Sequence, residues 1–195
     1  KLRDDNGWLG GKGDGWEETP YWLDGVVPLA YLLDDAQLKS KVLKYIQWTM
    51  DHQRPSGYFG PITKEEREKG IQVTPENCAA GEDWWPKMIM LKVLQQYYSA
   101  TRDQRVITFM TNYFRYQLKA VTTCKLGKWT EWAVSRGAEN VMMIQWLYTI
   151  THEKSLLDQV GFQHILDGVA LFADRGGEIV QPDRSAEEFF DHRQQ

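Results

Sequence analysis

The chain is poor in cysteine, with only Cys78 and Cys124 among its 195 residues. Two thiols at this separation supply neither a disulfide framework nor a zinc-binding spacing, and we expect both to be free. Long apolar runs are missing too: no stretch approaches the roughly 18 to 20 residues that a membrane span needs. These two shortages argue against a disulfide scaffold and against a membrane partner.

The chain also lacks an excess of positive charge. Its 23 Lys and Arg residues against 27 Asp and Glu residues give a formal charge of −4, and no basic patch of the kind that binds nucleic acid is visible. Gly10-Gly11-Lys12-Gly13 lacks the Lys-Ser/Thr and the preceding strand of a phosphate-binding loop. We expect all four histidines to be surface residues rather than catalysts. They are His52, His152, His164 and His192.

Aromatic residues are plentiful by contrast, with nine Trp and nine Tyr. Tryptophan is rarely fully buried, so we expect about half of these residues in the core and the rest along a groove. Acids and aromatics occur together in three clusters, each directly before an apolar segment. The clusters are Trp16–Asp24, Glu82–Pro86 and Trp129–Asn140. A carboxylate with a flat aromatic face beside it suits the binding of an amphipathic sugar ring.

Helical periodicity dominates and strand signals are sparse. We expect helices over about 20–33, 37–53, 84–100, 104–120, 138–150 and from about 154 onward. Thr19 is the expected N-cap of the first helix, with Pro20 at its first position and a kink at Pro28. The charged run 64–69 is expected to be a solvated surface loop.

Similar turns join the helices in pairs, which predicts a repeated helical hairpin. The first helix of each pair is apolar on nearly every face, whereas the second is amphipathic, so the first should be inner and the second outer. This predicts an all-α fold of the toroid or solenoid type, in one domain over 1–195 with an irregular tail at 173–195. All three clusters precede inner helices, so they should converge at one end of the ring.

The candidate catalytic residues are carboxyl groups beside aromatics, where burial raises the pKa and keeps a proton for donation. They are Glu17, Asp83 and Glu139. Simpler roles stay open for each of them. Asp83 could cap a helix that begins at Trp84, Glu17 and Glu18 could interact with a helix dipole, and Glu139 could pair with Arg136 or Lys128.

The candidate substrate-binding residues have side chains that stack on a sugar or hydrogen-bond its hydroxyls. They are Trp16, Glu18, Tyr21, Asp24, Trp84, Trp85, Arg136 and Asn140. Trp16, Trp84 and Trp85 are the candidates for stacking, and Tyr21 and Asn140 for contacts with hydroxyls.

Several motifs together resemble the beta-L-arabinofuranosidase family, glycoside hydrolase family 127. They are Gly7–Gly11, Glu17–Gly25, Gln53–Gly60 and Arg136–Asn140. The likeness covers about Gly7 to Asp158, and from about Gln159 the sequence is expected to stop resembling the family. It implies an (α/α)6 toroid with a sugar at the end of the ring. Three hairpins make half of such a ring, so we expect an N-terminal fragment of the catalytic toroid.

The resemblance also implies a catalytic centre of paired glutamate and cysteine residues late in the ring, with a zinc bound through thiolates, in a part missing from this chain, so we expect no cofactor here. Glu76-Asn77-Cys78 is similar to the family's Glu-x-Cys motif, but it falls before the second hairpin, and a chance match is expected.

The sequence thus favours a carbohydrate-active hydrolase acting on sugars derived from plant or microbial polysaccharides. We expect this chain alone to lack the full catalytic centre and to self-associate through its exposed inner face. A periplasmic or secreted parent is the expectation for the compartment.

Two alternatives stay open. A helical-repeat binding scaffold would not need acids clustered with tryptophans. Another toroid enzyme would need other groups: a terpene cyclase would need an Asp-rich cavity, whereas Asp34-Asp35 lies in a turn at the far end, and a polysaccharide lyase would need a Tyr, His and Arg set.

Overall fold

The computed structural model describes residues 4–13, 15–77, 84–124 and 136–158. In these ranges the protein is helical, and an isolated bridge between Asn6 and Gly13 is their only β pairing. The elements are η1 (Gly7–Leu9), α1 (Glu18–Leu32), α2 (Ala36–Asp51), α3 (Lys64–Lys69), α4 (Trp85–Thr101), α5 (Gln104–Cys124) and α7 (Gly137–Thr151). A further helical stretch begins at 155–158. The all-α prediction is therefore confirmed.

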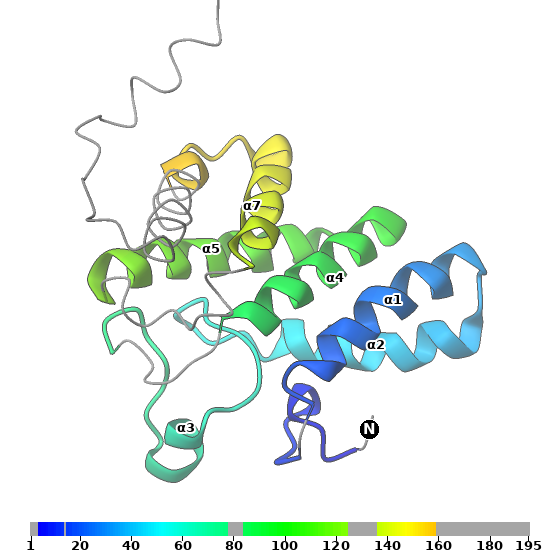
Figure 1. Cartoon of the computed structure of the whole chain (residues 1–195), viewed down its shortest axis with the longest axis horizontal. Coiled ribbons are helices and arrows are strands. Elements are labelled where there is room, and N and C mark those ends of the chain that lie inside the picture. The colour runs from blue at the N-terminus through cyan, green and yellow to red at the C-terminus, as the bar shows by residue number, and fades with distance from the viewer. Residues whose placement is uncertain (1–3, 14, 78–83, 125–135, 159–195) are drawn as a thin grey trace, which may run out of the picture.

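The long helices form two layers (Figure 1). Helix α4 packs between α1 and α7, while α2 lies behind α1 and α5 lies behind both α4 and α7. Burial follows this order. Helix α4 is enclosed on nearly all sides, with seven consecutive buried residues over 85–91. Helix α2 buries one stripe, Val42, Tyr45, Ile46 and Thr49. An enclosed helix must be apolar all round and an outer one only on one face. The predicted inner and outer layers are both present.

The start of α1 differs from the sequence prediction. The helix begins at Glu18, with Glu17 at the N-cap position and no capping bond from its side chain. Thr19 is not the cap: its buried hydroxyl accepts a hydrogen bond from the Asn6 amide at 2.8 Å. This bond fixes the N-terminal segment against α1. Pro28 lies inside α1, which continues on both sides of it.

The charged run 64–69 is a helix rather than a loop, although it is solvated as expected. Thr63 and Glu66 form a reciprocal capping box at its start, and Gly70 ends it in a left-handed conformation. The Arg54 guanidinium binds the Glu66 carboxylate at 2.8 and 2.9 Å and the Gly60 carbonyl at 2.6 Å. These bonds hold the 53–63 loop in place.

Helix α4 begins at Trp85, one residue later than predicted. Trp84 occupies its N-cap position without a capping side-chain bond, and Pro86 stands in the first turn, where the missing N–H of proline has no helical partner to lose. Asp83, the predicted cap and catalytic acid, lies outside the described residues.

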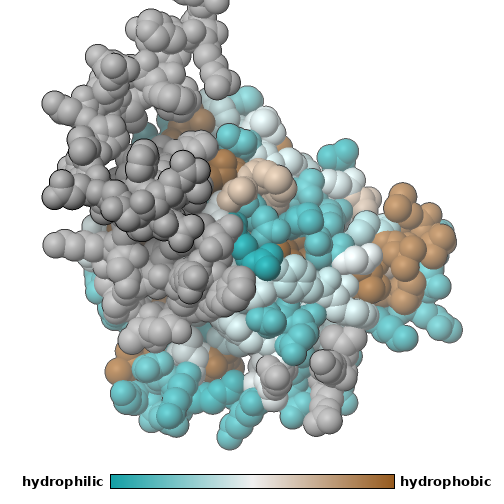
Figure 2. Space-filling view, in the orientation of Figure 1, coloured by the Kyte–Doolittle hydropathy of each residue, from teal (hydrophilic) through white to brown (hydrophobic). Residues whose placement is uncertain are grey.

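Apolar side chains gather at the far end of α1 (Figure 2). Leu29, Leu32 and Leu33 are 45%, 84% and 64% exposed there.

Self-association through an exposed apolar face stays a prediction, as do the single domain over 1–195 and the tail at 173–195. None of the helices in the described ranges has the length and apolar character to cross a bilayer.

Candidate functional site

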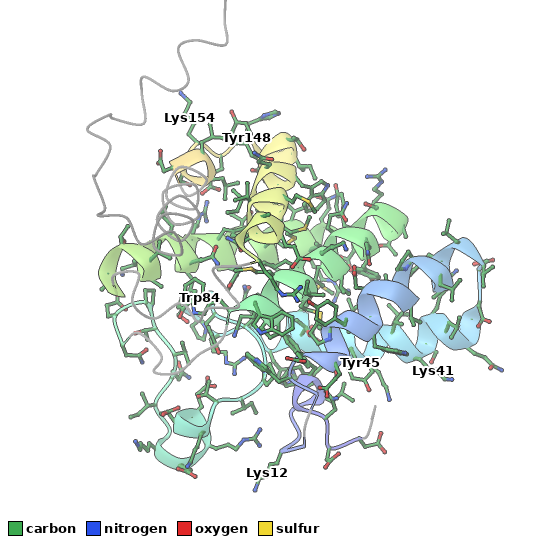
Figure 3. All side chains as sticks on the ribbon, in the orientation of Figure 1. Lys12, Lys41, Tyr45, Trp84, Tyr148 and Lys154 are labelled. Atoms are coloured by element: carbon green, nitrogen blue, oxygen red, sulfur yellow. The ribbon has the colours of Figure 1, made fainter. Side chains whose placement is uncertain are left out.

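The N-termini of the three inner helices meet at one place. The Tyr21 ring on α1 lies 5.3 Å from the Trp85 ring at the start of α4, centroid to centroid. Arg136, at the N-cap of α7, places its guanidinium carbon 5.8 Å from the Tyr21 ring and 5.0 Å from the Trp85 ring. A guanidinium at this distance is attracted to the ring faces. Figure 3 labels Trp84 at the start of α4, beside this junction.

Glu139 stands in the first turn of α7, three residues after Arg136. Its Oε2 atom is buried and has no hydrogen-bond partner in the described ranges. Burial raises the pKa of the Glu139 carboxyl, the positive charges of Arg136 and Lys92 oppose this, and the charge of Asp24 adds to it. A carboxyl group with a raised pKa can keep a proton to donate. Tyr21, Trp85, Arg136 and Glu139 are called the rim cluster below.

Asp24 joins α1 to α4 one turn deeper along the inner layer. Its carboxylate accepts from the Lys92 ammonium at 3.0 Å and from the Gln96 amide at 2.8 Å. Lys92 and Gln96 are four residues apart and so share a face of α4. The side chains of Asp24 and Lys92 are 21% and 33% exposed, so solvent reaches the pair. Asp24, Lys92 and Gln96 are called the inner network below.

Exposure differs among the aromatic residues of the junction. Tyr21 is 38% exposed, whereas Trp85 is 6% and Trp84 is 9% exposed. The Trp84 ring packs 6.3 Å from Tyr116 on α5. Trp84 and Trp85 thus support the junction from below, and Tyr21 presents the accessible ring.

Trp16 belongs to a neighbouring aromatic group. Its ring stacks on Trp8 at 6.0 Å, and the Lys87 ammonium lies 4.5 Å from its centre. The Trp8 indole N–H donates to the Trp16 carbonyl at 3.0 Å. Glu17 and Glu18 are exposed at the start of α1.

Asn140 is fully buried. Its amide exchanges two hydrogen bonds with the Gln117 amide, at 2.9 and 3.2 Å. This reciprocal pair ties α7 to α5 behind the rim cluster. The structure therefore brings together Tyr21, Trp85, Arg136 and Glu139, places Asp24 next to them, and commits the Asn140 amide to helix packing.

Sequence reasoning missed Lys92 and Gln96. The apolar pattern of α4 predicts an enclosed helix and gives its few polar residues no role. The spacing of Lys92 and Gln96, four residues apart on an otherwise enclosed helix, is the signal that indicates a shared polar contact.

The described residues contain no group of donors for the zinc that the resemblance implies. No three His, Cys, Asp or Glu side chains within the described ranges group closely enough to hold a metal. Cys78 and the side chain of Cys124 lie outside these ranges. The residues described do not fit a zinc ion, and we derive no chemical step through one.

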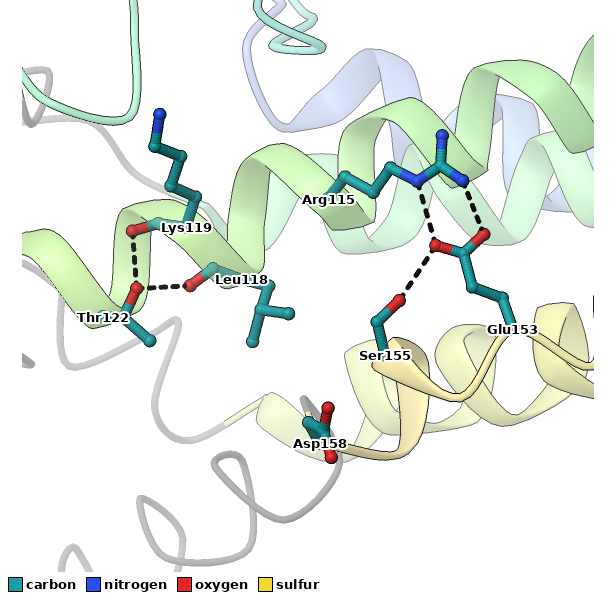
Figure 4. Close-up of a pocket in the computed structure, with 7 residues that line it drawn as sticks. All are labelled: Arg115, Leu118, Lys119, Thr122, Glu153, Ser155 and Asp158. Carbon is teal, nitrogen blue, oxygen red and sulfur yellow. Dashed lines mark hydrogen bonds and ion pairs between the residues drawn. The ribbon is translucent and has the colours of Figure 1, made fainter.

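A hollow lies on the outer layer, between α5 and residues 153–158 (Figure 4). The Arg115 guanidinium binds the Glu153 carboxylate there through two bonds of 2.9 Å, and the Ser155 hydroxyl donates to Glu153 at 2.9 Å. The lining residues come from α5 and the segment that follows α7, and none of them is aromatic. This hollow thus lacks the aromatic face of the rim cluster.

Comparison with known proteins identifies the family. A family model, the beta-L-arabinofuranosidase GH127 catalytic domain, matches residues 9–175. No curated protein and no solved structure matches the chain. The match continues past Gln159, so the expectation that the likeness ends there was wrong. Because the match covers well over half of the chain, the protein belongs to the family of beta-L-arabinofuranosidase-type catalytic domains of glycoside hydrolase family 127.

Proposed function

We propose that the protein belongs to a glycoside hydrolase that cleaves arabinofuranoside units from plant or microbial polysaccharide-derived sugars, and that the rim cluster binds the sugar. The single observation that carries this proposal is the meeting of Tyr21, Trp85 and Arg136 from three separate hairpins. The family match supports the reaction class.

The chemistry of the rim cluster suits a furanose ring. The accessible Tyr21 ring offers a face for the C–H groups of the sugar, while its hydroxyl and Arg136 offer hydrogen bonds. Trp85 supports both groups from the core side. A flat face bordered by polar groups matches a ligand that is apolar on one side and hydroxylated at its edge.

Glu139 is the group we propose as the acid. Glycosidic cleavage needs a proton on the leaving oxygen, and a carboxyl group whose pKa is raised holds its proton more readily until it is donated. Burial raises the pKa of Glu139, and its buried Oε2 has no hydrogen-bond partner among the described residues; both observations support this role. Glu17 borders the cluster, since its charge contributes to the raised pKa of Tyr21.

The test is hydrolysis of 4-nitrophenyl arabinofuranosides by the full-length protein, compared with a panel of other aryl glycosides. Glu139→Gln should lower kcat by about 10²- to 10⁴-fold, the usual contribution of a general acid, with a smaller change in KM. Glu68→Gln on the exposed face of α3 is the matched control and should leave both constants unchanged.

Failure to hydrolyse any aryl glycoside, together with no sugar binding by calorimetry, would overturn the enzyme proposal. Equal activity of Glu139→Gln and the wild type would remove Glu139 as the acid.

A further inference from the structure

Two buried acceptor atoms on the inner layer have no donor. They are Gln96 Oε1 and Glu139 Oε2, and neither has a hydrogen-bond partner in the part of the chain that the structure describes. Both belong to groups around Asp24: Gln96 donates to it at 2.8 Å, and Glu139 interacts with its charge. A buried polar atom without a partner is costly, so a native protein keeps one where water or a ligand completes the bond.

We propose that Asp24, Lys92 and Gln96 form a subsite for adjacent hydroxyl groups of the sugar ring, next to the rim cluster; this inference rests on the proposed function. The subsite hydrogen-bonds the hydroxyl groups, and the rim cluster binds the face of the ring.

The chemistry of the inner network favours a neutral polyol over an ion. The Asp24 carboxylate and the Lys92 ammonium lie 3.0 Å apart and balance each other's charge, so neither a cation nor an anion meets an uncompensated partner. A hydroxyl group both donates and accepts hydrogen bonds, and the inner network offers a partner of each kind. The Gln96 carbonyl oxygen accepts, and the Lys92 ammonium carries three donors, one of which points to Asp24.

The test compares two neighbouring glutamines of α4. Gln96→Met removes the amide of the inner network. Gln95→Met is the matched control, because among the described residues the side chain of Gln95 bonds only the Ser99 hydroxyl, at 3.3 Å. Calorimetry on the full chain measures the affinity for methyl L-arabinofuranoside and for its 2-deoxy and 3-deoxy analogues. Lys92→Met serves as the second variant should Gln96→Met fail to fold, which circular dichroism checks.

We expect Gln96→Met to weaken binding of the parent sugar by about five- to tenfold, the usual value of one hydrogen bond. The loss should shrink to less than about twofold for the deoxy analogue that lacks the recognised hydroxyl. A structural role would weaken all the sugars equally, and that result would overturn the subsite.

Unchanged affinity in Gln96→Met and Lys92→Met, or the same loss in Gln95→Met, would also overturn it. These outcomes leave the proposed function intact, because the wild type still binds the sugar. No binding by the wild type would overturn the proposed function and the subsite together.

Discussion

The buried amide pair between Asn140 and Gln117 gives a sharp test of how the inner and outer layers are joined. Asn140→Ala removes two hydrogen bonds, of 2.9 and 3.2 Å. It also removes the Asn140 donor from the Gln117 carbonyl oxygen at a site with no solvent exposure, while the Gln117 amide nitrogen keeps the Tyr113 hydroxyl at 3.4 Å. Net hydrogen bonds contribute about 0.5–1.5 kcal/mol each, and an unsatisfied buried group costs about 1–3 kcal/mol. We expect the free energy of unfolding to fall by about 2–4 kcal/mol.

Urea denaturation measures this change as a shift of the midpoint at constant slope. The double variant Asn140→Leu with Gln117→Leu replaces both amides by apolar groups of similar size and should recover most of the loss. A double-mutant cycle then gives the coupling between the two residues. A loss below about 0.5 kcal/mol for Asn140→Ala, or additive effects of the two leucines, would refute the claim that this pair holds α7 to α5.

Three further predictions concern charged groups. Burial raises the pKa of Glu139, so its contribution to the free energy of unfolding is complete at low pH and is lost as the pH rises through the folded pKa. Glu139→Gln should therefore flatten this part of the curve of stability against pH. Urea midpoints of the variant that follow those of the wild type across pH would contradict this prediction. Arg54→Met should lower the free energy of unfolding by about 3–5 kcal/mol, because it leaves the Glu66 carboxylate, whose side chain is 10% exposed, without its charged partner. The double variant with Glu66→Gln should recover this loss, and a loss that the second change leaves untouched would argue against the explanation. Arg115→Met should cost less than about 1 kcal/mol, because Arg115 is 61% exposed in its pair with Glu153; a larger shift of the urea midpoint would show that the outer hollow is part of the core.

The sequence pattern was a good guide to the layers. An inner helix is expected to be apolar on most of its faces, and α4 is enclosed in this way apart from a few polar residues, whereas the stripe on α2 separates its buried face from its exposed one. Helix starts were harder to predict, because a cap depends on tertiary partners. Thr19 has the right chemistry for an N-cap, yet Asn6 takes its hydroxyl for a different contact.

The site was predictable only in part. Acid and aromatic residues before each inner helix indicated where Tyr21, Trp85 and Arg136 would meet, because equivalent positions of a helical repeat lie side by side. Pattern could not tell that Asn140 turns toward Gln117, since one residue of helix rotation decides which side a polar group faces. Neither could it separate the exposed Tyr21 from the nearly buried Trp85.

A crystal structure of the full-length protein with methyl L-arabinofuranoside would show whether the sugar binds at the rim cluster. We expect the sugar ring within about 4 Å of Tyr21 and Glu139, at the junction of α1, α4 and α7. A sugar bound instead in the outer hollow beside Arg115 and Glu153, with the rim cluster untouched, would contradict it.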